Sequence, residues 1–377
     1  MSARRGGASM RLRGMVRKES LQILRDPSSI AIAFVMPVLL LLLFGYGVSL
    51  DAQHIPLAVV IERPDANSAG FAAVFEQSEY FSPRRLASIQ EAEQALRERQ
   101  VDGLVWLRGD FSRRLLAAGD APVGVILNGV DANQARIAQG YIQGAWQRWL
   151  QAYAALQGRE LTLPVAMEQR VWFNPALRSR NFLVPGLVAV IMTLIGALLT
   201  ALVVAREWER GTMEALMVTP IRIGELLLGK LLPYFVLGMG GMLLSVAMAR
   251  WQFGVPLNGS FWLLLLTSAL FMLVALGMGL LISTVARNQF VAGQIAILVT
   301  FLPAFILSGF IFDIGSMPAP VQFITHVVPA RYFVAILQTL FLAGDVWPVV
   351  LGNAAALLLM MLIFFAVLGR KARKSLE

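Results

Sequence analysis

The chain contains no cysteine and only two histidines, His54 and His326, among its 377 residues. Without cysteine there are no disulfides, so any part outside a reducing compartment must fold on its own apolar core. Thiolate metal sites are excluded, and the two histidines are too widely separated for a spaced zinc or haem motif. No G-x-S-x-G pattern indicates a nucleophile. We therefore expect no catalytic residue, no metal and no cofactor in this chain.

Charged residues are also scarce. Asp, Glu, Lys and Arg make up 15% of the chain and hydrophobic types 57%, whereas soluble domains carry about 25% charged residues. Six windows without Asp, Glu, Lys, Arg or His have about the 20 residues that a helix needs to cross a bilayer. These windows are Ile30–Leu50, Phe182–Ala205, Leu231–Ala249, Phe261–Val285, Phe290–Phe312 and Val346–Leu368. The sequence predicts an α-helical polytopic membrane protein with six transmembrane helices.

The lack of ionisable residues inside these windows disfavours an ion-driven carrier. Such carriers bury carboxylates or histidines as relay groups within their spans. If the protein moves a substrate, we expect the energy to come from another subunit.

The positive charge lies at the two ends of the chain. Residues 1–26 include seven basic and two acidic residues and residues 369–377 four and one, whereas residues 51–180 include fourteen of each. This distribution argues against nucleic acid as a partner. Basic residues that flank spans mark the cytoplasmic side. Both termini are therefore predicted to be cytoplasmic and residues 51–180 to lie outside, which agrees with an even number of spans.

The N-terminal segment allows alternatives. Its apolar run of 21 residues exceeds the roughly 7–15 residues of a cleaved signal peptide, which favours a signal anchor. Apolar and basic residues alternate from Met10 to Leu24, and this pattern favours a helix at the inner membrane surface over a basic tail that only sets the topology. Pro27 ends the pattern, because the residue before a proline avoids the helical conformation.

Residues 51–180 alternate between strand-like and helical patterns. Strands are predicted at Ile55–Ile61, Arg85–Ala87, Gly103–Leu107 and Val123–Leu127, and helices at Asn67–Gln77, Ile89–Arg99 and from an N-cap at Asp131 to Ala155. A last strand, Val165–Phe173, is predicted to return the chain to the membrane. Such alternation is typical of an α/β fold. We expect an α/β extracytoplasmic domain inserted between transmembrane helices one and two.

Residues Gly224 to Lys230 have the G-x-x-x-x-G-K spacing of an ATP-binding loop. The context does not fit, because such a loop follows a strand and ends in Ser or Thr, whereas Leu231 follows here and a span begins. A helix whose Lys230 side chain extends to the membrane interface is the better interpretation.

The segment Arg206-Glu-Trp-Glu-Arg-Gly-Thr-Met-Glu214 between the second and third spans is rich in both signs of charge. Its carboxylates and arginines suit ion pairs with a soluble partner. Trp208 and Met213, with Leu216 and Met217, would supply apolar contacts. An ordinary solvated turn is the alternative that composition leaves open.

Four stretches of the sequence point to a known family. They are Lys18 to Pro27, Trp172 to Gly186, Arg206 to Pro220 with Glu225 and Gly229-Lys230, and Leu307 to Ile311 with Met317-Pro318 and Pro329 to Tyr332. On these residues the chain resembles the permease subunits of ATP-binding-cassette (ABC) exporters of the type-two membrane class, in the bacterial multidrug-efflux-like subgroup with a large outer domain. Asp313 departs from the family pattern, in which a proline often follows the Phe-Ile-Phe run.

The resemblance implies a half-transporter in the bacterial inner membrane. It would pair with a second permease, alike or related, and with cytoplasmic ATPase subunits that bind ATP and Mg²⁺. The interfacial helix would contact the ATPase through Arg17, Lys18, Glu19, Leu24 and Arg25. The coupling loop would do so through Glu207, Trp208, Glu209, Arg210, Gly211, Thr212, Met213, Glu214 and Pro220.

The resemblance also implies a division of the chain. Residues 1–28 form a cytoplasmic tail with the interfacial helix, 29–50 the first span, 51–180 the outer domain, 181–369 five further spans and 370–377 a basic tail. Residues 206–230 would form the cytoplasmic coupling loop and residues 313–345 an outer re-entrant segment. A large outer domain implies an envelope membrane-fusion adaptor protein as a further partner.

The glycines of Gly238–Gly241 and Gly277–Gly279 permit close helix approach. They would serve either a dimer seam or moving pathway, or ordinary packing within the bundle. A pathway lined by Met, Phe and small residues would suit a hydrophobic or amphipathic cargo. The alternatives to an exporter permease are a membrane-anchored sensor or scaffold whose outer domain binds a ligand, and an ion-coupled carrier.

Overall fold

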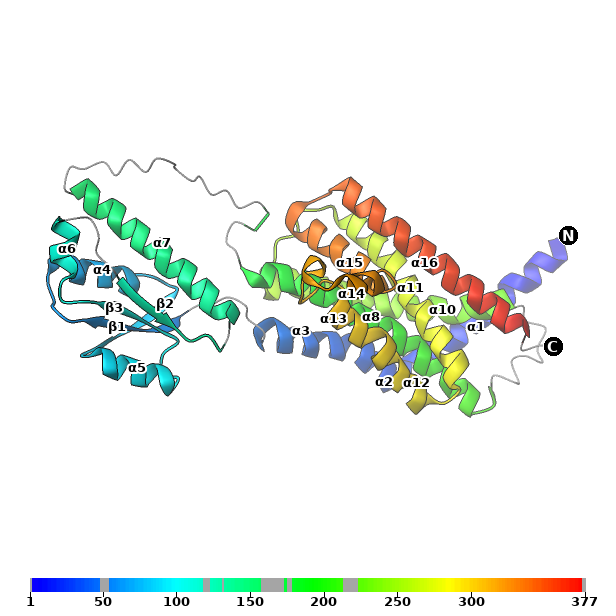
Figure 1. Ribbon diagram of the computed structural model, residues 1–377. Helices are drawn as coiled ribbons and strands as arrows, with labels where there is room; N and C mark the ends of the chain where they lie inside the picture. Colours follow the sequence, from blue (N-terminus) through cyan, green and yellow to red (C-terminus); the bar gives the residue numbers. More distant parts are fainter. Residues whose placement is uncertain are drawn as a thin grey trace. The chain divides into compact units, whose positions relative to one another are not determined.

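The computed structural model describes residues 2–47, 54–117, 123–130, 132–156, 173–174, 178–212 and 223–374 (Figure 1). The chain forms two compact units. One is Leu50–Arg170, and the other combines Met1–Ser49 with Val171–Glu377. The larger unit is helical, and the smaller unit holds the one sheet that the described residues form.

Six helices among the described residues of the larger unit are long and apolar enough to cross a membrane. They are Pro27–Gly47, Ser179–Glu209, Gly224–Gln252, Phe261–Ala286, Gln289–Leu307 and Trp347–Arg370. The helical pair Ala319–Thr325 and Pro329–Ala343 is bent by 85° and would add a seventh span if it were counted as one. The prediction of a polytopic helical membrane protein is confirmed.

Several spans contain more than one helical element, because short π-helical turns interrupt them. In chain order the elements of the larger unit are α1 (Ser2–Leu24), α2 (Pro27–Ile30), η1 (Ala31–Val35), α3 (Met36–Gly47), α8 (Ser179–Glu209), α10 (Ile223–Ala247), η2 (Met248–Gln252), α11 (Phe261–Ala286), α12 (Gln289–Ala296), η3 (Ile297–Phe301), α13 (Leu302–Leu307), η4 (Ile314–Ser316), α14 (Ala319–Thr325), α15 (Pro329–Gln338), η5 (Thr339–Ala343) and α16 (Trp347–Lys374). The break between α1 and α2 comprises Arg25 and Asp26, directly before Pro27, where the sequence predicts it.

Helix α8 is the central helix of this unit. Of its most apolar stretch 94% is buried, compared with 22% for the first span and 11% for the last. It packs against α3, α10, α11, α12 and α15. Because close-packed interiors are stiff and transmit strain, a displacement of one end of α8 is passed to these neighbours.

Glycines allow the closest contacts within the bundle. A Cβ at Gly279 of α11 would collide with the Ala197 carbonyl oxygen and the Thr200 hydroxyl of α8. A Cβ at Gly241 of α10 would collide with the Ala33 carbonyl oxygen. For these two glycines the structure supports the alternative of packing within the bundle.

The smaller unit contains a four-stranded sheet of order β2-β1-β3-β4. β1 (Ile55–Ile61) pairs in parallel with β2 (Phe81–Leu86) and β3 (Gly103–Leu107), and β4 (Val123–Leu127) pairs with β3 in the antiparallel sense. In this register Val59 of β1 lies between Arg85 of β2 and Val105 of β3. The helices are α4 (Ala66–Glu76), α5 (Ile89–Arg97), α6 (Phe111–Ala117) and α7 (Ala132–Leu156).

Side chains of β1 alternate between two cores. Leu57 and Val59 belong to the core that α4, α6 and α7 cover, whereas Ala58 and Val60 belong to the core beneath α5. Figure 1 shows α5 on one face of the sheet and the other three helices on the opposite face. Burial on both faces explains why β1 is a continuous apolar run.

Most predicted elements of this unit are confirmed. The strands Ile55–Ile61, Gly103–Leu107 and Val123–Leu127 agree at both ends. β2 begins at Phe81, four residues before the predicted start at Arg85. The prediction missed these residues because a proline and two arginines in this edge strand interrupt the apolar pattern. Helix α6 is absent from the prediction, and Asp131 and residues 165–172 of the predicted last strand lie outside the described residues.

We expect Gly279→Ala to destabilise the helical unit, although alanine normally favours a helix. The new Cβ would displace the Thr200 hydroxyl, which donates to the Leu276 carbonyl oxygen at 2.9 Å. Overpacking of this kind typically costs about 1–3 kcal/mol. In Gly277→Ala, the matched control, the nearest atom lies 3.5 Å from the new Cβ. Thermal unfolding in detergent should show a lower Tm for Gly279→Ala alone, and an equal Tm for both variants would contradict this packing.

Candidate functional site

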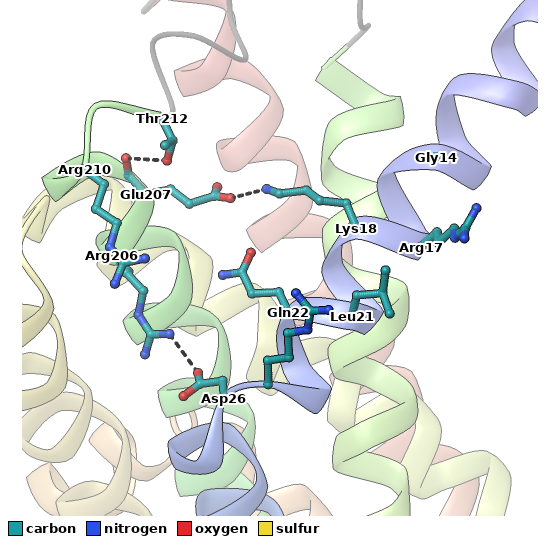
Figure 2. A pocket seen from close by; sticks show the side chains of 11 residues that line it. Gly14, Arg17, Lys18, Leu21, Gln22, Asp26, Arg206, Glu207, Arg210 and Thr212 are labelled. Atoms are coloured by element: carbon teal, nitrogen blue, oxygen red, sulfur yellow. Dashed lines mark hydrogen bonds and ion pairs between the residues drawn. The ribbon is translucent and has the colours of Figure 1, made fainter.

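A hollow of ≈ 1170 Å³ lies between α1 and the C-terminal end of α8 (Figure 2). Most of the charges that line it are basic. They come from α1 and the residue after it, and from the last turn of α8 and the residue after it, namely Arg17, Lys18, Arg25, Arg206 and Arg210. The structure thus brings the two segments predicted to contact an ATPase, the interfacial helix and the start of the coupling loop, to one hollow.

One face of α1 holds it against α10. Met15, Glu19 and Ile23 recur every four residues and are buried, so they lie on one side of the helix. Arg11 makes a bidentate ion pair with Glu225 of α10, with distances of 3.0 and 3.1 Å. The helix begins at Ser2, earlier than the predicted Met10.

Four charged side chains from three helices form what we call the buried charge cluster: Lys18, Glu19, Glu207 and Lys230. The Lys18 Nζ lies 2.9 Å from Glu207 Oε1 and 3.1 Å from Glu19 Oε1. The Lys230 Nζ lies 3.5 Å from Glu19 Oε1 and also pairs with Glu207 Oε2. Figure 2 shows the Lys18 side chain reaching from α1 to Glu207 on α8.

Three members of this cluster are almost inaccessible to water. The exposed fraction of the side chain is 0% for Glu19, 3% for Lys230 and 5% for Glu207. An ion in the protein interior loses several kcal/mol of hydration, which a close counter-ion must offset. Two ammonium groups balance two carboxylates here, so each member depends on the others. The cluster therefore fixes α1, α8 and α10 to one another.

The position of Lys230 corrects the prediction that its side chain extends to the membrane interface. Helix α10 begins at Ile223, so Lys230 lies about two turns inside it. Its partner Glu207 is 23 residues earlier in the sequence, and Glu19 comes from α1. No local pattern shows that these residues meet, so the sequence alone could not place Lys230 in a buried cluster.

A second ion pair joins Asp26, the N-cap of α2, to α8. Arg206 Nη1 donates to Asp26 Oδ2 at 2.8 Å, and the two side chains are 16% and 14% exposed. Burial alone would raise the pKa of Asp26, but hydrogen bonds from Ser28, Ser29 and Arg206 and the Arg206 charge lower it to about 2. Asp26 is therefore ionised at physiological pH, and this ion pair keeps its charge.

Helix α8 extends further than the sequence indicates. Its last four residues, Arg206–Glu209, are helical, whereas the sequence predicts a loop from residue 206. Gly211 follows with a φ of +67°, a left-handed conformation that suits the end of a helix. The Thr212 hydroxyl donates to the Glu207 carbonyl oxygen at 3.2 Å. Since α10 begins at Ile223, the predicted loop 206–230 is helical at both ends.

The turn between α11 and α12 holds two residues of the predicted coupling loop. The Arg287 guanidinium lies 4.9 Å from the Trp208 ring centroid, which is a cation–π contact. The Asn288 side-chain amide donates to Glu209 Oε1 at 2.6 Å. Trp208 is also half-buried against the helical core. The sequence prediction does not include Arg287 or Asn288, because nothing local links them to residues near the end of α8.

The remaining predicted residues have different surroundings. Arg17, Arg25 and Arg210 are exposed and take part in none of the ion pairs among the described residues. Leu24 is 72% exposed. Met213, Glu214 and Pro220 lie outside the described residues. Within the described part of the chain, the three arginines are therefore cationic groups that a soluble partner can reach.

The arrangement suits the transmission of a displacement. In the ranges that the structure describes, no three His, Asp or Glu side chains lie together as possible metal ligands. The carboxylates near the hollow are bound instead to lysine, arginine or amide groups. A displacement of α1 would reach the last turn of α8 through these ion pairs. From there the continuous helix α8 would carry it to the centre of the bundle.

Residues 27–370 match a protein family described as "ABC-2 family transporter protein". "Probable multidrug ABC transporter permease YbhS" of Escherichia coli (strain K12) is 44% identical over 97% of this chain and 98% of its own length. "Probable multidrug ABC transporter permease YbhR" of the same strain is 30% identical over 91% and 95%. "Linearmycin resistance permease protein LnrN" of Bacillus subtilis (strain 168) is 23% identical over 94% and 96%.

We expect Lys230→Met to destabilise the helical unit strongly, because Glu19 and Glu207 would then share one half-exposed lysine. Removing one partner of a buried ion pair typically costs about 3–5 kcal/mol. The measurement is thermal unfolding of the purified protein in detergent. Adding Glu207→Gln to Lys230→Met should recover much of the loss, since it removes one uncompensated carboxylate.

The matched control for this prediction is Arg17→Met, which removes an exposed charge from α1 without touching the buried charge cluster. Its Tm should equal that of the unmodified protein. A Lys230→Met variant as stable as Arg17→Met, or a double variant less stable than Lys230→Met alone, would show that the cluster does not stabilise the unit.

Proposed function

This chain belongs to the ABC-2 family of transporter proteins, and from that membership we propose that it is the permease subunit of an ABC exporter. In this role it spans a bacterial inner membrane several times and forms the translocation pathway. ATP and Mg²⁺ are bound by a separate cytoplasmic ATPase subunit, and this chain is not itself an enzyme. The names of the relatives YbhS and YbhR, which both include "ABC transporter permease", support this role.

The structural observation that supports an ATPase partner is the basic hollow between α1 and the end of α8. It gathers Arg17, Arg25 and Arg210, whose charges are exposed, beside the buried charge cluster. We propose that the ATPase docks over this hollow with acidic groups, for which arginine is a strong partner. ATP-driven movement of the ATPase would then displace α1 and α8 together, because the cluster and the Asp26–Arg206 pair join them.

The proposed assembly contains a second permease, alike or related, and cytoplasmic ATPase subunits. The basic residues at both ends of the chain support a cytoplasmic location for both termini. The α/β unit follows the first span in the sequence, so this topology assigns it to the extracytoplasmic side. There it would contact an envelope membrane-fusion adaptor protein.

We propose a hydrophobic or amphipathic cargo. An apolar hollow of ≈ 400 Å³ lies among α8, α11, η3 and the helices α13 to α16, and its walls include Met278, Val299 and Phe364 with Thr193 and Thr300. Its volume falls in the range of about 300–1,000 Å³ that small-molecule sites occupy. The words "multidrug" and "linearmycin resistance" in the relatives' names support the export of organic compounds.

We expect Arg210→Glu to weaken ATPase binding without unfolding the permease, because Arg210 is exposed and lies outside the buried charge cluster. The tagged protein would be purified in mild detergent with its ATPase, and vanadate-sensitive ATP hydrolysis measured. Several-fold less ATPase should be recovered at an unchanged Tm. The matched control is Arg13→Glu, because Arg13 is an exposed arginine of α1 that lies outside the hollow. If no ATPase accompanies even the unmodified protein, the sensor and carrier alternatives gain support.

Glu209 requires a separate test, because the structure gives it a partner within the chain. If Glu209 couples through direct contact with the ATPase, Glu209→Ala should lower efflux of a hydrophobic dye several-fold, whereas Asn288→Ala should leave efflux unchanged. If Glu209 acts only by fixing the turn before α12, the two variants should lose efflux equally. Unchanged efflux in Glu209→Ala, alone and together with Glu214→Ala, would contradict a coupling role for either carboxylate.

A further inference from the structure

The strand order of the α/β unit reverses at β1. The chain places β2 on one side of β1 and β3 on the other, and all three strands run in parallel. In open α/β sheets, ligands bind outside the carboxyl ends of the strands at such a reversal. The ends of β1 and β3 lie together here, because the Glu62 amide donates to the Leu107 carbonyl oxygen at 3.1 Å.

A hollow of ≈ 460 Å³ lies at these two strand ends, and we call it the β1–β3 hollow. It is formed by the residues that follow β1, by the end of β3, by the residues between β3 and α6 and by the start of α6, namely Glu62, Arg63, Trp106, Arg108, Gly109, Asp110 and Arg113. Its volume lies within the range of about 300–1,000 Å³ for small-molecule sites. Nothing in the proposed permease role requires a hollow at this place.

Glu62 joins the two sides of the hollow. Its Oε1 accepts from Trp106 Nε1 at 2.9 Å, and its Oε2 accepts from the Gly109 amide at 2.7 Å. A Cβ at Gly109 would lie only 3.3 Å from Glu62 Oε2 and 3.4 Å from the Arg63 side chain. The Glu62 carboxylate is therefore engaged in shaping the hollow, and Gly109 leaves room for this contact.

Three arginines around the hollow have no such engagement. Arg63, Arg108 and Arg113 take part in none of the ion pairs that the described residues make. The second carboxylate of the lining, Asp110, pairs with Arg114, whose Nε lies 3.7 Å from Asp110 Oδ2. The Arg108 guanidinium lies 4.7 Å above the Trp106 ring. A planar guanidinium binds carboxylate and phosphate groups with two parallel hydrogen bonds.

We propose that the β1–β3 hollow binds a small organic anion through a phosphate or carboxylate group held by Arg63 and Arg113, with Arg108 stacked on Trp106 beside it. The ligand enters a hollow that Glu62 and Gly109 already shape. This binding site belongs to the α/β unit alone and does not depend on the proposed exporter role.

The test uses the full-length protein in nanodiscs of zwitterionic lipid at constant ionic strength. Binding of radiolabelled glycerol 3-phosphate and of radiolabelled citrate is measured separately, with glycerol as the uncharged competitor. We expect saturable binding of at least one probe, unaffected by glycerol, with at least tenfold lower affinity in Arg63→Gln and in Arg113→Gln. The probe that binds decides between phosphate and carboxylate.

Arg97→Gln is the matched control, since Arg97 is an exposed arginine of the same unit that lies on α5, away from the hollow. All three variants change exposed side chains, so each should keep the Tm of the unmodified protein. The proposal is overturned if neither probe binds saturably at millimolar concentration, or if Arg63→Gln and Arg113→Gln bind as tightly as Arg97→Gln.

Discussion

A lysine ammonium buried between two carboxylates is the constraint on which the packing of α1, α8 and α10 depends. Lys230, Glu19 and Glu207 come from three helices, and their side chains are at most 5% exposed. Each ion is tolerated away from water only while its counter-ions stay in place. The helices α1, α8 and α10 therefore cannot separate without exposing or stranding a charge, and they behave as one body.

This constraint gives the exposed charges of the hollow a path to the membrane interior. α8 carries Glu207 in its last turn and is also the most deeply buried of the six candidate spans. The Asp26–Arg206 pair connects the start of α2, directly after α1, to α8, and the bond between Asn288 and Glu209 links α8 to the start of α12. A displacement at the surface thus reaches the spans that contain α8, α10 and α12 through polar contacts and close packing.

The sequence was sufficient for features that depend on local pattern. Length and hydrophobicity located the six spans, and short apolar runs located β1, β3 and β4. It failed where partners are distant: Lys230 looked like an interfacial lysine because Glu19 is far away in the chain, and Asn288 gave no sign of its bond to Glu209. The end of α8 was placed too early, because its charged last turn resembles a loop. The sequence identified segments of the site but not their pairings.

The most direct test is whether α1 and α10 move as one body during ATP hydrolysis. The chain has no cysteine, so spin labels can be attached only at Arg13→Cys of α1 and at Leu228→Cys, a position of α10 that is 60% exposed and lies outside the hollow, with the ATPase bound. The mean distance between the labels should be the same without nucleotide and after trapping with ATP and vanadate. In Lys230→Met the distribution of distances should become broader. A distance that changes between the two states while Lys230 is present would contradict the account.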